Sequence, residues 1–228
     1  MNAAIVLLAA GAGRRVGAET NKVLLPLDGV PVLVHSVRTA LAVPGVHRIV
    51  VVVRPEDRDE VAAALAPHLG SHDVWLIDGG AERHDSEDNA LQALRGDIES
   101  GEIAVVAIHD AARPLASSAL FEQALAVAGR DGGAVPVVPA SGLSRRDGSA
   151  APGDLVAVQT PQAFAAGPLL HAYDAARDVS FAGTDTASFL ERFTDATITA
   201  IAGEAANIKV TYPEDLALAE NLIRTATG

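Results

Sequence analysis

Two lysines are the first residues in the sequence that suggest chemistry. Lys22 and Lys209 are the only lysines among seventeen basic residues, and all the others are arginine. An ammonium group is a compact charge with three rotatable donors, which suits phosphate oxygens and differs from the planar guanidinium of arginine. The two lysines are therefore candidates for phosphate binding, and chance in an arginine-rich composition is the alternative.

A loop of small residues before Lys22 could bring the backbone close to that phosphate. The segment LAAGAGRR, residues 8–15, follows a short apolar run, and its candidate nucleotide-binding residues are Ala10, Gly11 and Gly13. Arg14, Arg15 and Lys22 then place three cations in one stretch of a chain whose net charge is −12. Such cations repel one another unless an anion lies among them, and a triphosphate would supply it. Glycines needed only for the turn, with solvated charges beside them, are the alternative.

The glycine loop matches no standard nucleotide motif. A dinucleotide fingerprint would need its third glycine one residue before Gly17, and an acidic residue would end the second strand, where Arg54 stands. The P-loop pattern G-x-x-x-x-G-K-[ST] is absent from the sequence. An NAD(P)-dependent dehydrogenase is therefore a weak alternative.

A second candidate set follows an apolar run at 103–108, in the segment HDAARP. A carboxylate at the carboxyl end of a buried strand faces the ligand crevice of an open α/β sheet, where Mg²⁺ can bridge it to phosphate oxygens. Asp110 is therefore a candidate metal ligand, and Arg113 could grip a phosphate with two hydrogen bonds. An aspartate that only caps the next turn is the alternative. We expect His109 to be structural and not a base.

A third candidate set lies in the segment DGGAERHDS, residues 78–86, which follows another apolar run. Glycines that allow close approach, followed by a helix N-terminus, suit recognition of the polar edge or the sugar of a nucleotide. Gly79 and Gly80 end the strand here, and Arg83 and Ser86 open the next helix. An ordinary helix N-cap is the alternative.

The elements that must position these residues alternate along the chain. Short β-branched runs predict strands at 4–9, 48–53, 74–77, 103–108 and 134–138. Their continuous apolar character is typical of parallel strands buried on both faces. Helical periodicity predicts helices at 32–42, 56–69, 86–95 and 118–128. This alternation predicts a single α/β domain over residues 1–228, with a mostly parallel, doubly wound, Rossmann-like sheet.

The rhythm breaks after Pro139. Residues 141–154 are punctuated by Gly, Ser and Pro, which predicts a small projecting arm at about 139–157. Beyond the arm we expect strands at 156–159, 197–201 and 208–211, and helices at 168–177 and 185–192. A last helix should begin at 212–215 and turn three leucines inward, Leu216, Leu218 and Leu222.

Composition excludes several classes of protein. A chain with 17 basic and 29 acidic residues is a poor partner for nucleic acid or anionic membranes, because its summed field repels them. With no cysteine, disulfides and thiolate metal sites are excluded. The apolar runs are far shorter than the roughly 20 residues of a membrane-spanning helix. We therefore expect a cytoplasmic protein.

Seven segments, in order along almost the whole chain, resemble one enzyme family. They read LAAGAGRR, NKV, DGGAERHDS, HDAARP, QTPQAF, TDTAS and NIKVTYPEDLALAE. The chain resembles 2-C-methyl-D-erythritol 4-phosphate cytidylyltransferase, of which ribitol 5-phosphate cytidylyltransferase is a close relative. The resemblance implies a nucleotidyltransferase-type fold, a homodimer, and Mg²⁺-dependent transfer of CMP from CTP to a polyol phosphate.

The resemblance also implies roles for the candidate residues. Three cations would stabilise charge at the reacting phosphates, namely Arg15, Lys22 and Lys209. The residues that would bind the nucleotide are Ala10, Gly11, Gly13, Gly80, Arg83 and Ser86. Asp110 and Arg113 would contact the acceptor, with Asp110 near the metal.

The acceptor half departs from the family pattern. An Asp-Thr pair followed by a basic residue is usual after the fifth strand, but residues 140–145 read ASGLSR and contain no threonine. An arginine usual before TPQ has no clear counterpart near 152–155. In relatives these residues reach across a dimer into the partner's acceptor site. The alternatives are therefore another acceptor, such as ribitol 5-phosphate, or a non-catalytic nucleotide-binding homologue.

Overall fold

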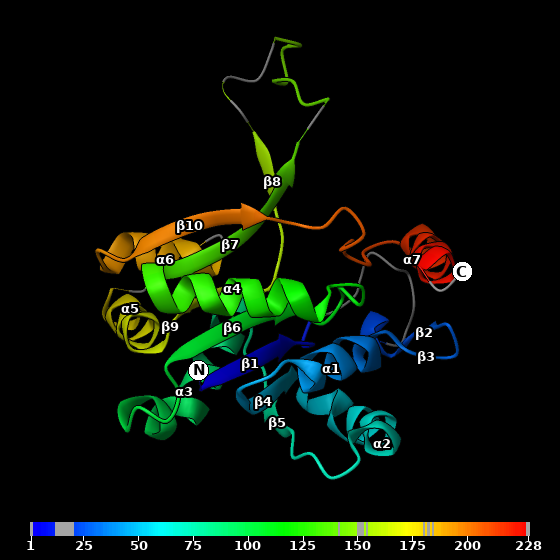
Figure 1. The fold of residues 1–228 in the computed structure, drawn as a ribbon, viewed down its shortest axis with the longest axis horizontal. Helices are drawn as coiled ribbons and strands as arrows, with labels where there is room; N and C mark the ends of the chain where they lie inside the picture. The colour runs from blue at the N-terminus through cyan, green and yellow to red at the C-terminus, as the bar shows by residue number, and fades with distance from the viewer. Residues whose placement is uncertain are drawn as a thin grey trace.

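The computed structural model describes residues 2–11, 21–140, 142–149, 153, 155–179, 181, 183 and 185–226. Within these residues the centre of the fold is an eight-stranded sheet with helices on both faces (Figure 1). Its strand order is β10-β7-β9-β6-β1-β4-β5, and β8 pairs with β7. The doubly wound, mostly parallel α/β architecture predicted from the sequence is confirmed.

All five strands predicted in the first part of the chain are present, with bounds shifted by one or two residues. They are β1 (Ala3–Leu8), β4 (Val46–Val53), β5 (Trp75–Asp78), β6 (Val105–Asp110) and β7 (Gly132–Pro139). β1 pairs in parallel with both β4 and β6, and every residue of β6 is buried. The continuous apolar runs thus mark strands that are covered on both faces.

Three further strands complete the sheet, namely β8 (Val156–Val158), β9 (Gln162–Ala165) and β10 (Thr197–Ala202). β9 is not predicted by the sequence analysis, and it runs antiparallel to both of its neighbours, β6 and β7. The strand predicted at 208–211 is wrong, because these residues form no β-ladder. Side chains and isolated backbone hydrogen bonds hold that segment instead.

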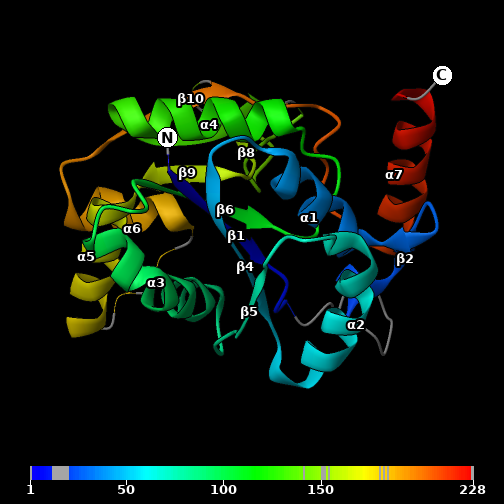
Figure 2. The same ribbon diagram turned by 60° about the horizontal axis from the view of Figure 1, so that its bottom comes forward.

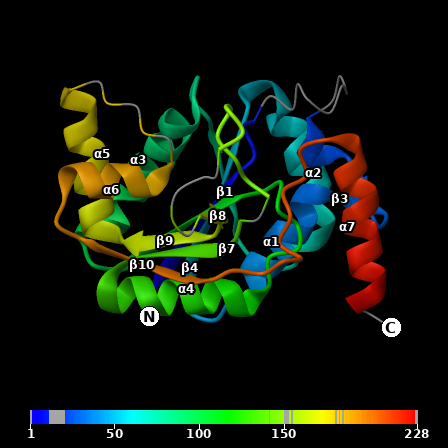
Figure 3. The same cartoon turned by 90° about the horizontal axis from the view of Figure 1, so that it is seen from above.

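The helices form one layer on each face of the sheet (Figures 2 and 3). One layer contains α1 (Val32–Ala42), α2 (Arg58–Leu69) and α4 (Ser118–Asp131), and the other contains α3 (Arg83–Glu99), α5 (Ala166–Asp178) and α6 (Thr186–Phe193). Each layer buries its own apolar cluster against the sheet, around Phe121 on one face and Phe189 on the other.

α3 begins at Arg83, before the start of the helix predicted at 86–95, and its first turn explains this earlier start. The Glu82 side chain accepts a hydrogen bond from the backbone of Asp85, and Asp85 Oδ2 accepts one from Glu82 N at 2.9 Å. This reciprocal capping starts the helix at Arg83 and brings Arg83 and Ser86 into its first turn.

Five further elements complete the described part of the fold. They are η2 (Lys22–Leu24), β2 (Pro26–Leu27), β3 (Val30–Pro31), η3 (Pro55–Asp57) and α7 (Pro213–Ala226). α7 packs against Leu27 through Ala219 and Ile223, and Leu216 also faces this contact. Leu218 is 48% exposed, so its predicted inward position is wrong. It lies off the 3.6-residue stripe formed by Leu216, Ala219 and Ile223.

The arm begins where β7 and β8 leave the body as an antiparallel pair, with Pro139 opposite Val156 (Figure 1). At its described tip, Arg145 N donates to Ser149 O at 2.8 Å and closes a tight turn. None of the described helices is long and apolar enough to cross a membrane.

Candidate active site

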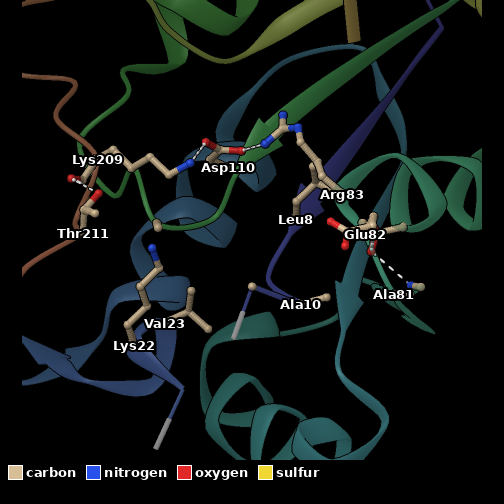
Figure 4. A pocket seen from close by; sticks show the side chains of 14 residues that line it. Leu8, Ala10, Lys22, Val23, Ala81, Glu82, Arg83, Asp110, Lys209 and Thr211 are labelled. Atoms are coloured by element: carbon tan, nitrogen blue, oxygen red, sulfur yellow. Dashed lines mark hydrogen bonds and ion pairs between the residues drawn. The ribbon is translucent and has the colours of Figure 1, made fainter. Parts of the chain in front are cut away.

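A cavity of about 530 Å³ lies at the carboxyl ends of β1, β5 and β6 (Figure 4). Ala10 and Gly11 line it after β1, and Asp110 lines it from the last position of β6. Lys22 and Lys209 both line it, although they lie near opposite ends of the sequence. The carboxyl end of the strands is where open α/β sheets bind their ligands.

Asp110 joins two cations in the wall of this cavity. Its Oδ2 accepts from Lys209 Nζ at 2.6 Å, and its Oδ1 accepts from Arg83 Nη1. Burial alone would raise the pKa of Asp110, but Arg83 and Lys209 outweigh burial and hold the pKa well below its usual range. Asp110 is therefore an ionised carboxylate in a mostly buried position, and it accepts from two donors that could also bind phosphate.

Lys22 is positioned by the residue before it. Asn21 is buried, and its side-chain amide donates to Ala9 O at 3.0 Å and to Asp57 Oδ2 at 2.7 Å. Asn21 Oδ1 accepts from Val23 N and caps the short helix η2, of which Lys22 is the first residue. Asp57 is held in turn by two hydrogen bonds from Arg54, at 2.6 and 2.8 Å. Arg54, which stands where a dinucleotide-binding fold would have an acidic residue, thus supports the segment that carries Lys22.

Lys209 is held without a strand. Gln159 Nε2 donates to Glu204 O at 2.8 Å, and Asn207 Nδ2 donates to Thr160 O at 2.9 Å. Val210 N donates to Ala112 O at 2.8 Å, one residue beyond the lysine. The first two bonds tie the segment before α7 to the connection between β8 and β9, and the third ties it to the loop after β6, which places Lys209 beside Asp110.

Arg113 belongs to the same arrangement. Its Nη1 donates to Asn207 O at 2.7 Å, so the guanidinium holds the backbone that leads to Lys209. Arg113 is half-buried, and burial lowers its pKa. It is not among the residues that line the cavity, in contrast to Asp110.

The turn between β5 and α3 needs its glycines for close packing. A Cβ on Gly79 would lie 2.6 Å from Ala10 Cβ, and one on Gly80 would lie 2.1 Å from Asp85 Cβ. Ser86 Oγ accepts from Gly80 N and donates to Glu82 O, both at 3.1 Å. Ser86 therefore closes the turn, as in the N-cap alternative, and it also lines the cavity.

His109 is structural, as the sequence analysis expects. It is fully buried and lies between Thr160 Oγ1 and Arg113 O, each 3.1 Å from one of its ring nitrogens. Burial lowers the pKa of His109 to about 4, so the imidazole is neutral at neutral pH. Its neutral ring fixes the loop that follows Asp110.

The structure thus brings together most of the predicted site residues. Those that line the one cavity are Ala10, Gly11, Lys22, Gly80, Arg83, Ser86, Asp110 and Lys209. Arg15 and Gly13 lie outside the described residues. The supporting residues are the ones that the sequence analysis missed. Asn21 and Gln159 stand inside quoted motifs, which was the available signal. The acids Asp57 and Glu87 carried none, although Glu87 lies 2.8 Å from Arg83 Nε.

The donors present fit a magnesium ion that arrives with a triphosphate. Among the described residues, no three His, Asp or Glu side chains gather as a preformed metal site. Mg²⁺ commonly uses only one or two carboxylates together with substrate phosphates, and Asp110 is such a carboxylate, ionised and facing the cavity.

Comparisons with known proteins identify the family. The family model described as IspD: 2-C-methyl-D-erythritol 4-phosphate cytidylyltransferase matches residues 3–225. The enzyme of that name from Bacillus mycoides is 34% identical over 225 residues, which cover 96% of each chain. A crystal structure of the enzyme from Thermus thermophilus has a TM-score of 0.73 at 26% identity, covering 98% of this chain and 100% of the other.

A third comparison concerns the fold alone. The crystal structure of 4-diphosphocytidyl-2C-methyl-D-erythritol synthase from Anaerococcus prevotii has a TM-score of 0.83 at 24% identity, covering 98% of this chain and 96% of that one. With these matches, the fold and the cation-lined cavity define a nucleotidyltransferase, and specifically a cytidylyltransferase. The chain belongs to the 2-C-methyl-D-erythritol 4-phosphate cytidylyltransferase family.

Proposed function

We propose that this protein, as one domain over residues 1–228, transfers CMP from CTP to 2-C-methyl-D-erythritol 4-phosphate. The products are 4-diphosphocytidyl-2-C-methyl-D-erythritol and pyrophosphate. The observation that carries the proposal is the meeting of Lys22 and Lys209 with Asp110 in one cavity at the carboxyl ends of the strands. The names of the family and of its relatives supply the two substrates.

The reaction needs no nucleophile from the protein. An oxygen of the acceptor phosphate attacks the α-phosphorus of CTP, the bond from that phosphorus to the bridging oxygen breaks, and pyrophosphate leaves with the electron pair. Catalysis of such a transfer rests on positioning and on charge stabilisation. We assign charge stabilisation at the α-phosphate to Arg15, Lys22 and Lys209.

The remaining site residues bind the two substrates. The nucleotide site comprises the residues of the two glycine turns, Ala10, Gly11, Gly13, Gly80, Arg83 and Ser86. Asp110 and Arg113 are assigned to the acceptor phosphate side, Arg113 through the backbone it holds as well as by its charge. Asp110 would also hold Mg²⁺, which neutralises phosphate charge when bound.

A homodimer is part of the proposal. Four apolar side chains on the described part of the arm are 41–56% exposed, namely Leu143, Leu155, Val156 and Val158. An exposed apolar surface of this kind marks a contact, and a second copy of the chain would cover it. Light scattering after size-exclusion chromatography should give twice the monomer mass of 23.3 kDa. We also propose that the reaction takes place in the cytoplasm.

A pyrophosphate-release screen tests the function. Each of the four nucleoside triphosphates is paired with 2-C-methyl-D-erythritol 4-phosphate or with ribitol 5-phosphate, with Mg²⁺ and with excess EDTA. We expect release only from CTP with methylerythritol phosphate, and none in EDTA. Release only with ribitol 5-phosphate would fit the missing threonine of the arm and would change the acceptor. CTP binding without turnover on either acceptor would identify a non-catalytic homologue.

A further inference from the structure

Glu87 is a buried carboxylate for which the proposed reaction has no use. It lies on the inward face of α3, with 1% of its surface exposed, one turn before the core residues Ala90 and Leu91. An ionised carboxylate is expensive to bury unless it is paired and hydrogen-bonded, so its partners indicate what it does.

The partners of Glu87 come from three helices. Tyr173 Oη on α5 donates to Glu87 Oε2, and Thr186 Oγ1 at the start of α6 donates to Glu87 Oε1 at 3.1 Å. Arg83 Nε lies 2.8 Å from the same Oε1, one turn back on α3, in an ion pair whose N–H is not aligned for a hydrogen bond. Burial raises the pKa of Glu87, whereas Arg83 and the two hydroxyl groups favour its charged form.

Arg83 therefore stands between two carboxylates. Its Nε faces Glu87 in the core, and its Nη1 donates to Asp110 in the wall of the cavity. A guanidinium group that is held at both ends keeps one orientation, whereas a group held only by Asp110 can rotate about its side-chain bonds. The Arg83 side chain is 34% exposed, so packing alone does not confine it.

We infer that Glu87 is a positioning residue that fixes Arg83 against Asp110 and anchors this arrangement to α5 and α6 through Tyr173 and Thr186. The inference rests on the proposed function, because Arg83 is assigned there to the nucleotide site. Since the pair is buried, its use is orientation and not added stability: replacing a buried ion pair is often neutral for stability, whereas misplacing a catalytic group lowers the rate.

A double-mutant cycle in the full chain tests the inference. Glu87→Gln keeps the size of the side chain and one of the two oxygens that accept from the hydroxyl groups, and it removes the charge that faces Arg83. We expect it to lower kcat/KM for pyrophosphate release by about 10- to 100-fold. In an Arg83→Ala background the same change should have no further effect, because the group that Glu87 orients is gone. An equal loss in both backgrounds would show a general structural role and overturn the inference.

A second readout needs neither substrate nor activity. In protein labelled with ¹⁵N-arginine, relaxation of the Arg83 Nε–H pair should report an ordered side chain, and Glu87→Gln should make it mobile. Unchanged order in Glu87→Gln would contradict the inference. If the wild-type protein releases no pyrophosphate, the proposed function fails, and this measurement still decides the role of Glu87.

Asp88→Asn is the matched control. Asp88 is the next acid on α3, and it pairs with Arg177 at 3.5 Å and with Gln92 at 2.9 Å instead of Arg83. We expect Asp88→Asn to keep kcat/KM within twofold of wild type and to leave the order of the Arg83 side chain unchanged. A loss as large as that of Glu87→Gln would show that any acid removed from this helix disturbs the site.

Discussion

Lys209 Nζ lies 2.6 Å from Asp110 Oδ2, although 99 residues separate the two in the sequence. Both residues line the cavity, and the ion pair keeps the ammonium at the carboxyl end of β6. An ammonium has three donors, so Lys209 can bind Asp110 and still offer hydrogen bonds to a phosphate. Asp110 thus holds in place a cation that the proposed reaction needs.

Lys22→Ala and Lys209→Ala should each lower kcat by about 10²–10³, by analogy with the loss of one donor to a developing anion. The measurement is pyrophosphate release at saturating CTP. Arg130→Ala is the control, because Arg130 is exposed and its partner among the described residues is the adjacent Asp131, and it should leave kcat unchanged. Near-wild-type turnover in both lysine variants would remove the basis of the proposed mechanism.

Asp57→Ala should lower both the free energy of unfolding and kcat. The change leaves the Asn21 amide and the Arg54 guanidinium without their carboxylate, and an unsatisfied buried donor costs about 1–3 kcal/mol. Urea denaturation should show that loss, and kcat should fall because Lys22 follows Asn21 directly. Glu56→Ala is the control: Glu56 also faces Arg54, at 3.6 Å, but it is exposed and should cost at most about 1 kcal/mol.

Gly80→Ala should disturb the nucleotide side of the cavity. Its Cβ would lie 2.1 Å from Asp85 Cβ, so the turn before α3 must shift. We expect a loss of stability of about 1–3 kcal/mol and CTP binding about tenfold weaker by calorimetry. Gly96→Ala, within α3 itself and with nothing within 4 Å of the new Cβ, should instead stabilise the protein by about 0.5–1 kcal/mol. Equal effects of the two changes would contradict this account.

Because of His109, the free energy of unfolding should fall in mild acid. Its pKa of about 4 in the folded protein lies below the 6.5 of the free side chain, so between these values the unfolded chain binds the extra proton. The free energy of unfolding therefore falls as the pH drops from 6.5 to 4, by an amount on the order of 3 kcal/mol. Urea denaturation across that range should show a steeper decline for wild type than for His109→Asn. Parallel curves would contradict the buried, neutral imidazole.

The sequence predicts the strand and helix pattern well because burial on both faces leaves long apolar runs, as in β4 and β6. The sequence predicts secondary structure poorly where tertiary contacts, and not the local hydrophobic pattern, determine the conformation. The segment around Lys209 has the apolar neighbours of a strand, Ile208 and Val210, yet it is held by side chains of Gln159 and Asn207 from outside any ladder. Four residues at β9 are too few to show periodicity.

The site shows the same division. Most residues that touch the cavity stand beside glycines or at strand ends, and Lys22 and Lys209 are the only lysines of the chain, so types and positions predict them. The residues that support them could not be predicted in this way, because Arg54 and Asp57 have the composition of an exposed charged turn. Glu87 is spaced four residues from Arg83 like any surface pair, and only the packing of α5 and α6 over it makes it buried.

The place of β9 between β6 and β7 governs how the chain can be made. Until residue 165 has left the ribosome, β6 and β7 are two open edges with no partner between them. Unpaired edges of apolar strands invite association with other nascent chains. A growing polypeptide therefore passes through a stage in which the edges of two apolar strands are exposed. A chain truncated between β7 and β9 should accumulate in inclusion bodies, whereas the full chain should not.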